Sequence, residues 1–119
     1  MWKKSIAGLM MVSVTLASTP AQAEEFDTLL QSSLTPAEVA IHQQRGNTRA
    51  LQLARNACTQ LDAGTSIQAF AAQVSQSLAK EGLPREKLET TALYTGKVIA
   101  VGIASFCPKH LSQLQELQP

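Results

Sequence analysis

The sequence has few aromatic residues, with one tryptophan, one tyrosine and three phenylalanines among its 119 residues. Platforms that stack single-stranded bases combine several aromatic side chains with a basic groove. The charge shows no such bias, because 10 lysines and arginines mix with 9 acidic residues along the chain. The most basic region, residues 45 to 55, is typical of the solvated side of a helix. The sequence therefore predicts no nucleic-acid partner.

The common motifs of hydrolases are also missing. The chain contains neither a G-x-S-x-G nucleophile elbow nor an H-E-x-x-H zinc motif. Asp62, which shortly precedes Gly64, is more typical of a helix end than of a general base. We therefore expect a non-enzymatic protein without catalytic residues.

No apolar run is long enough to span a bilayer, which takes about 20 residues. The longest, Ile6 to Ala17, follows Lys3 and Lys4 and precedes the small-x-small site Ala21-Gln22-Ala23. This order is typical of a secretory signal peptide cleaved after Ala23. The pattern predicts a signal peptide at 1–23, a single helical domain at 24–110 and a frayed C-terminal tail at 111–119. We expect a secreted or periplasmic protein with no stable membrane insertion after cleavage.

Strand signals are absent, because no segment alternates with period two and no Asn-Gly or Asp-Gly hairpin turn occurs. Helix signals are frequent instead. Thr35, Pro36 and Glu38 form a capping box with proline at the first helical position. Gly46 predicts a break, and Gly64 predicts the end of a helix. The apolar face between them comprises Leu51, Ala54, Cys58 and Leu61.

Two further helices are predicted in the C-terminal half. Thr65, with Gln68 as its partner, is expected to cap the first, which buries Ile67, Phe70, Val74 and Leu78 and ends at Gly82. The second runs from Arg85 until Pro108 stops it, and its apolar stripe comprises Leu88, Ala92, Ile99, Ile103 and Phe106. A row of small residues on it is predicted to admit a close helix: Ala92, Gly96, Ala100 and Ala104. The fold class is all-α, a small disulfide-stapled bundle of three to four main helices.

Two cysteines, Cys58 and Cys107, lie on the apolar sides of their predicted helices. In a secreted chain, such a pair favours a single disulfide. A bridge between them would close a loop of about fifty residues, which the chain-entropy model values at roughly 4 kcal/mol.

Other uses of these residues remain open but are less favoured. A zinc cage would need all of Cys58, Cys107, His42 and His110. Haem could bind a Cys-Pro thiolate, or Tyr94, His42 or His110, but we expect the histidines to be exposed and Tyr94 half-buried. A catalytic cysteine would need a free thiolate, which pairing removes. The sequence therefore predicts no cofactor-binding and no metal-binding residue.

Two segments resemble a known family. A-R-N-A-C-T-Q-L-D-A-G-T-S at 54–66 and A-S-F-C-P at 104–108 are similar to domain-of-unknown-function family 732, small secreted bacterial proteins. Its recurring features are Cys-x-x-Leu-x-x-Gly, matched by Cys58, Leu61 and Gly64, and aromatic-Cys-Pro, matched by Phe106, Cys107 and Pro108. The FDTLL segment at 26–30 resembles its leading helix. The resemblance covers residues 26–110 and implies a compact helical domain with a Cys58–Cys107 bridge, but no activity.

Three functions are compatible with these features. The favoured one is a non-enzymatic binding or interaction module for a protein or a small apolar ligand, since the core has few large side chains. A periplasmic stress chaperone or holdase is the alternative, although a charged fraction of 16% is low for that class. A haem or metal carrier is the third.

Overall fold

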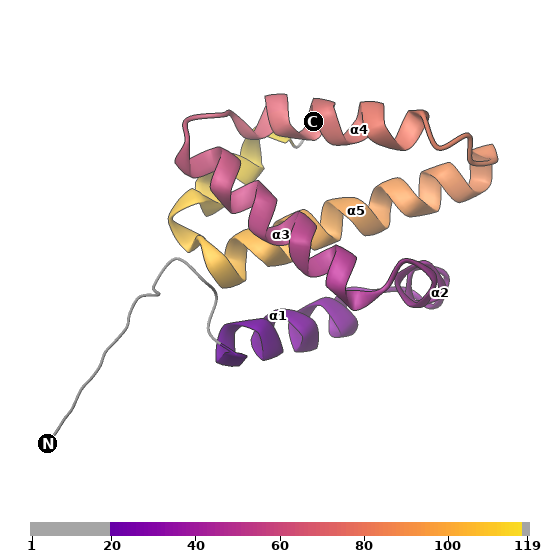
Figure 1. The fold of residues 1–119 in the computed structure, drawn as a ribbon, viewed down its shortest axis with the longest axis horizontal. Helices are drawn as coiled ribbons and strands as arrows, with labels where there is room; N and C mark the ends of the chain where they lie inside the picture. Colours follow the sequence, from indigo (N-terminus) through magenta and orange to yellow (C-terminus); the bar gives the residue numbers. More distant parts are fainter. Residues whose placement is uncertain (1–19, 118–119) are drawn as a thin grey trace, which may run out of the picture.

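The computed structural model describes residues 20–117, and every regular element in that range is a helix (Figure 1). The all-α prediction is therefore confirmed. The elements in chain order are α1 (Pro20–Ser33), α2 (Pro36–Arg45), α3 (Asn47–Asp62), α4 (Ile67–Ala79), α5 (Arg85–Phe106) and the 3-10 helix η2 (Pro108–Leu117).

The predicted signal peptide falls mostly outside the described residues, at positions 1–19. Helix α1 begins at Pro20 and runs through the predicted cleavage site at Ala23. Its two fully buried side chains, Phe26 and Leu30, both follow that site. Cleavage there would consequently keep the residues that anchor α1. The predicted tail at 111–119 lies within η2 as far as Leu117.

Most predicted helix ends are found where the sequence placed them. The Glu38 N–H donates to Thr35 Oγ1 at 3.3 Å, and the Thr35 N–H donates to Glu38 Oε1 at 2.9 Å, which completes the capping box of α2. Gly46 separates α2 from α3 with a φ of +93°, and Gly64 follows α3 with a φ of +99°. Both glycines adopt backbone angles that other residues rarely tolerate.

The predicted cap of α4 is wrong by one residue. Ser66, not Thr65, is the N-cap, because its Oγ accepts from the Ala69 N–H at 3.1 Å. The Thr65 hydroxyl donates instead to Gln60 Oε1 at 3.0 Å. Two neighbouring hydroxyl residues satisfy the same capping pattern, and only the path of the turn decides between them.

The core consists of two clusters of buried side chains, and α5 contributes to both. One surrounds the disulfide and comprises Ala57, Cys58, Leu61, Ile67, Phe70, Ile99, Ile103 and Cys107. The other joins α1, α2, α3 and α5 and comprises Phe26, Leu30, Ile41, Ala50, Ala54, Tyr94 and Val98. Partly buried Phe106 packs against both clusters, so α5 acts as the central helix of the bundle.

The sequence predicted that another helix packs closely against the small residues of α5, but this prediction placed the contact on the wrong face of the helix. Ala92, Gly96 and Ala104 are exposed and Ala100 is half-buried, so no helix among residues 20–117 covers this row. The close neighbours are Gly102 and Ala54 of α3: a Cβ on Gly102 would lie 2.5 Å from the Ala54 Cβ. The buried face of α5 is partly polar and includes Thr91, Tyr94, Thr95 and Ser105. The apolar stripe predicted from the sequence does not include these polar residues, so it did not identify the buried face of α5.

An ion pair between buried Glu38 and partly exposed Lys97 helps to join α1, α2 and α5. Lys97 Nζ donates to Glu38 Oε1 at 2.6 Å and to the Ser33 carbonyl at 2.8 Å. Burial disfavours the ionised Glu38, but the hydrogen bonds from Lys97 and Thr35 outweigh it and hold the pKa of Glu38 below its ordinary value. Glu38 therefore caps α2 and fastens it to the central helix.

Candidate functional site

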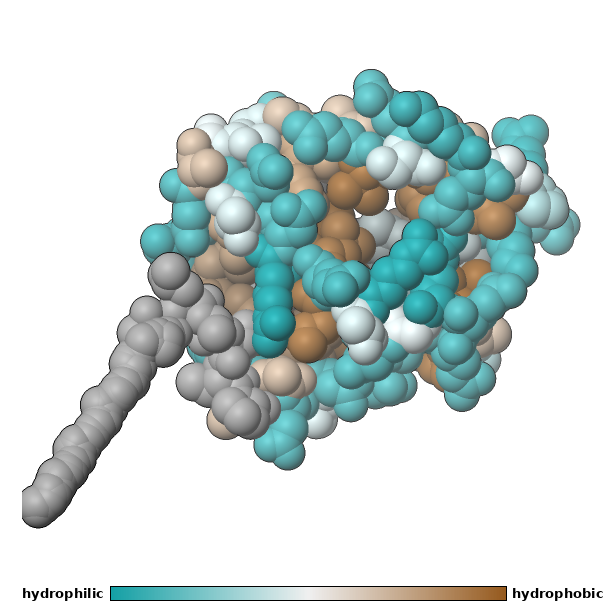
Figure 2. Space-filling view, viewed as in Figure 1, coloured by the Kyte–Doolittle hydropathy of each residue, from teal (hydrophilic) through white to brown (hydrophobic). Residues whose placement is uncertain are grey.

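Helices α3, α4 and α5 enclose a pocket of about 270 Å³. We call it the apolar groove, after the large apolar side chains among its lining residues: Leu53, Phe70, Val74, Leu78 and Val98. Figure 2 shows a hollow between α4 and α5 with hydrophobic residues inside it and hydrophilic residues around it.

The groove exists because α4 is held at its two ends. At its N-terminal end, the Ile67 N–H donates to Gln113 Oε1 of η2 at 3.3 Å. Beyond its C-terminal end, Glu81 accepts from Arg45 and lies 3.6 Å from Arg49 Nη2. Figure 1 shows α4 running alongside α5 between these two attachments. The middle of α4 therefore borders the groove.

One end of the groove is positively charged. Arg45 donates to both carboxylate oxygens of Glu81, at 2.5 Å and 3.3 Å. A second pocket of about 210 Å³ shares Arg45, Arg49 and Glu81 with the groove and adds Lys87 and Thr91. We call these five residues the cationic mouth. The Arg45 hydrogen bonds, opposed by partial burial, hold the pKa of Glu81 below its ordinary value.

The basic region 45–55 was predicted to be solvated, and this is wrong for Arg45. Its side chain is only 14% exposed, whereas that of Arg49 is 61% exposed. Glu81 explains the difference, because its two hydrogen bonds with Arg45 offset part of the cost of removing the guanidinium from water.

His42 and Tyr94 form a buried pair, against the prediction that His42 is exposed and Tyr94 half-buried. His42 is 4% exposed and Tyr94 is 3% exposed. A hydrogen bond of 2.6 Å joins His42 Nδ1 to the Tyr94 hydroxyl. Burial raises the pKa of Tyr94, despite the opposing charges of Arg45 and Arg49. The polar residues that follow His42 in the sequence led to the prediction that it is exposed. In the structure, α2 directs the His42 side chain toward Tyr94 of α5.

The predicted disulfide between Cys58 and Cys107 is present, with the two Cα atoms 5.8 Å apart. Both sulfurs are used in this bond. The zinc cage, the thiolate haem ligand and the catalytic thiol therefore each lack the free thiolate they need. His110 also lies in a different network from His42.

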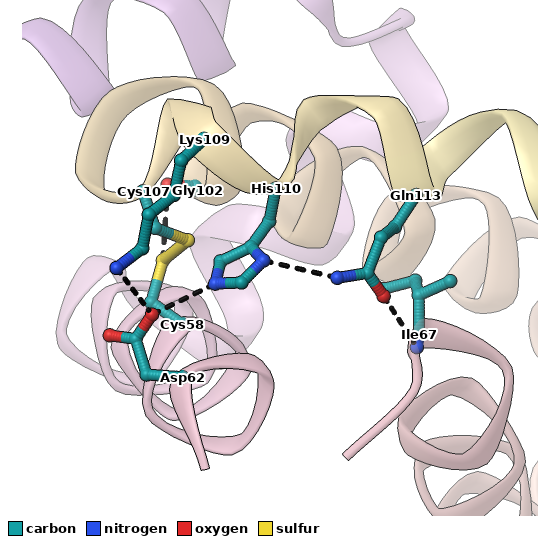
Figure 3. Close-up of polar contacts among 8 residues, drawn as sticks. All are labelled: Cys58, Asp62, Ile67, Gly102, Cys107, Lys109, His110 and Gln113. Carbon is teal, nitrogen blue, oxygen red and sulfur yellow. Dashed lines mark hydrogen bonds and ion pairs between the residues drawn. A yellow bond between two sulfur atoms is a disulfide. The ribbon is translucent and has the colours of Figure 1, made fainter. Parts of the chain in front are cut away.

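Beside the disulfide, a chain of polar contacts links three elements (Figure 3). The Asp62 carboxylate lies 2.8 Å from His110 Nε2, and His110 Nδ1 lies 3.0 Å from Gln113 Nε2. Gln113 uses its carbonyl oxygen to accept from the Ile67 N–H, so its amide group donates to His110 and His110 Nε2–H donates to Asp62. This chain joins the end of α3 and the start of α4 to η2.

Asp62 is the third carboxyl group that the fold keeps ionised. Its hydrogen bonds from His110 and Lys109 hold the pKa of Asp62 below its ordinary value. It therefore joins Glu38 and Glu81, and each of these residues connects separate helices.

We expect the free energy of unfolding to fall as the pH drops below about 4.5, the ordinary pKa of the two glutamates. A carboxyl group with a lowered pKa in the folded state contributes stability above its unfolded pKa, and loses it as the pH falls through the folded value. Urea unfolding between pH 7 and pH 3 measures this dependence.

Glu81→Gln isolates one of these groups. The variant should be less stable than the wild type at pH 7, and the gap should narrow as the pH falls through the lowered pKa of Glu81. Glu86→Gln, at an exposed position of α5, is the matched control and should stay close to the wild type throughout. A constant gap between the wild type and Glu81→Gln over this range would contradict the assignment.

The fold and the site define an all-α domain with one disulfide among the described residues and an apolar groove between three helices. The chain belongs to the family described as "Protein of unknown function (DUF732)", whose model matches residues 30–109. The match includes both cysteines and all residues of the groove, and it confirms the resemblance seen in the sequence. No curated protein and no solved structure matches the chain. Within residues 20–117, no helix has the length and apolar character needed to cross a membrane.

Proposed function

We propose that this protein is a non-enzymatic, secreted or periplasmic binding module that takes a small apolar ligand into the groove between α3, α4 and α5. The observation that carries the proposal is the groove itself, about 270 Å³ with Leu53, Phe70, Val74, Leu78 and Val98 among its walls. The disulfide is compatible with an oxidising compartment, and residues 1–23 have the pattern of a signal peptide.

The size of the groove fits a small ligand. Typical ligand pockets measure about 300–1,000 Å³, and a closed apolar cavity of about 150 Å³ already binds benzene. A groove of about 270 Å³ lies between these values. Small-molecule sites usually combine apolar walls with a few placed polar groups, and the groove combines large apolar side chains with polar ones.

The surface favours a small ligand over an unfolded client. Exposed large hydrophobic residues in the described part of the chain are Leu29, Leu93 and Leu111, on α1, α5 and η2. Single hydrophobic residues on separate elements are ordinary on a protein surface and do not form the broad patch that a holdase presents. Haem ligation by the Tyr94 oxygen would disturb its hydrogen bond with His42, and both side chains are buried.

A pair of serines on α4 allows a controlled test. Ser77 lines the groove, whereas Ser75 is an exposed residue of the same helix outside it. The probe is N-phenyl-1-naphthylamine, a neutral apolar dye whose fluorescence rises on leaving water. The wild type should bind it saturably. Ser77→Trp, which fills the groove, should lower the affinity by about tenfold or more, which is about 1.4 kcal/mol.

Ser75→Trp is the matched control and should bind the dye as the wild type does. The proposal is wrong if the wild type shows no saturable binding. Equal affinities of the two tryptophan variants would also exclude the groove as the site.

A further inference from the structure

We propose that the ligand is an amphipathic anion, a single apolar chain with one negatively charged head, and that the head binds at the cationic mouth. This inference rests on the proposed function, because it assigns the chemistry of the ligand in the same groove.

The mouth carries an excess of positive charge. Arg45, Arg49 and Lys87 line it together with a single carboxylate, Glu81. Arg45 is occupied by Glu81, with which it makes two hydrogen bonds. Arg49 is 3.6 Å from the same carboxylate and has an exposed side chain, and no salt bridge among residues 20–117 involves Lys87. Arg49 and Lys87 can therefore receive one further anion.

A buried hydroxyl group without a partner lies at the same place. Thr91 is fully buried, lines the second pocket, and its Oγ1 has no hydrogen-bond partner. One turn further along α5, the Thr95 hydroxyl donates to the Thr91 carbonyl at 2.7 Å, which is the usual arrangement for a helical threonine. Leaving a buried hydroxyl unsatisfied costs about 1–3 kcal/mol. An oxygen of the ligand head would satisfy it.

The head and the chain of such a ligand would occupy two adjacent pockets. The two pockets share Arg45, Arg49 and Glu81 as common walls. A head held by Arg49, Lys87 and Thr91 therefore places its chain toward Val74 and Val98 in the groove. Guanidinium groups bind carboxylate and phosphate oxygens in preference to neutral groups, so either acid could supply the head.

Three ligands with the same chain test the role of the head: decanoate, decanol and decyltrimethylammonium. Decanol is titrated calorimetrically below its solubility limit, and the two ions are titrated below their micellar concentrations. We expect decanoate to bind about tenfold more tightly than decanol, a difference of about 1.4 kcal/mol. The cation should bind no better than decanol. The decanoate advantage should shrink with added salt, because the mouth is partly open to solvent. A comparison of the affinities of decyl phosphate and decanoate shows whether the site prefers a phosphate or a carboxylate head.

Variants locate the head. Arg49→Gln combined with Lys87→Gln should remove the preference for decanoate, so that decanoate and decanol bind this double variant with equal affinity. Thr91→Val should remove part of the preference for decanoate. It should not lower the stability of the protein, since the valine side chain needs no hydrogen-bond partner. Arg55→Gln, which removes one positive charge of α3 outside both pockets, is the control for Arg49→Gln alone and should keep the full preference.

The outcomes separate the two proposals. Equal affinities for decanoate and decanol would overturn the assignment of the head and leave the binding function intact. A preference that survives Arg49→Gln/Lys87→Gln would also overturn it. Binding of neither ligand would contradict the proposed function itself.

Discussion

Replacing both cysteines, as Cys58→Ala/Cys107→Ala, is expected to lower the free energy of unfolding by about 4 kcal/mol. The two residues are 49 positions apart, so the bond removes much of the freedom of the unfolded chain. Small domains have a total stability of only about 5–15 kcal/mol. The variant should therefore be close to the limit of folding. Urea unfolding followed by circular dichroism measures the loss.

The wild type after reduction is the natural comparison for this variant. Both should lose similar stability, because both lack the same covalent link. The cysteines also lie in the core cluster and are 8% and 5% exposed, so the alanine variant loses some packing in addition. A double variant within about 1 kcal/mol of the oxidised wild type would show that the bond does not hold this fold together.

The second large effect is expected at Gly102. A Cβ at this position would lie 2.5 Å from the Ala54 Cβ and 2.9 Å from the Ala54 Cα. The second contact involves backbone, so relief requires α3 to move away from α5. Overpacking of this kind costs about 1–3 kcal/mol, and Gly102→Ala should lie near the upper end. Thermal and urea unfolding measure it.

Gly96→Ala is the matched control on the same helix. Nothing lies within 4 Å of a Cβ at Gly96, and the residue is exposed. Alanine should therefore stabilise the helix by about 0.5–1 kcal/mol. The two substitutions should have opposite signs, and the same sign for both would contradict the observed packing. Ala54→Gly should recover part of the loss in Gly102→Ala, a coupling that a double-mutant cycle detects.

Local signals explain why much of the fold could be predicted from the sequence. The cap at Thr35, the breaks at Gly46 and Gly64 and the stop at Pro108 all depend on a few neighbouring residues. The disulfide followed from a chain with only two cysteines. These features need no knowledge of which helices meet.

The orientation of α5 could not be predicted in this way. Its row of small residues suggested a packing face. The face that is actually buried includes threonines and a tyrosine, which hydropathy scales do not rank as strongly hydrophobic. His42 was missed for the same reason, since its environment depends on Tyr94, which is 52 residues away.

The groove was also beyond local patterns. It depends on the link between Arg45 and Glu81, which are 36 residues apart, and on the link between Ile67 and Gln113, which are 46 residues apart. The sequence supplied each of these residues, but only the fold brings them together. The prediction of a small apolar ligand was general, and the structure gives it a specific candidate site.

The most direct test of the binding account is a methyl NMR titration of the oxidised protein with decanol, a neutral apolar ligand. We predict saturable shifts of the methyl groups of Leu53, Val74, Leu78 and Val98, which line the groove. Leu29 and Leu93, exposed on α1 and α5, should not respond. Shifts confined to these exposed leucines, or no saturable shifts at all, would contradict binding in the groove.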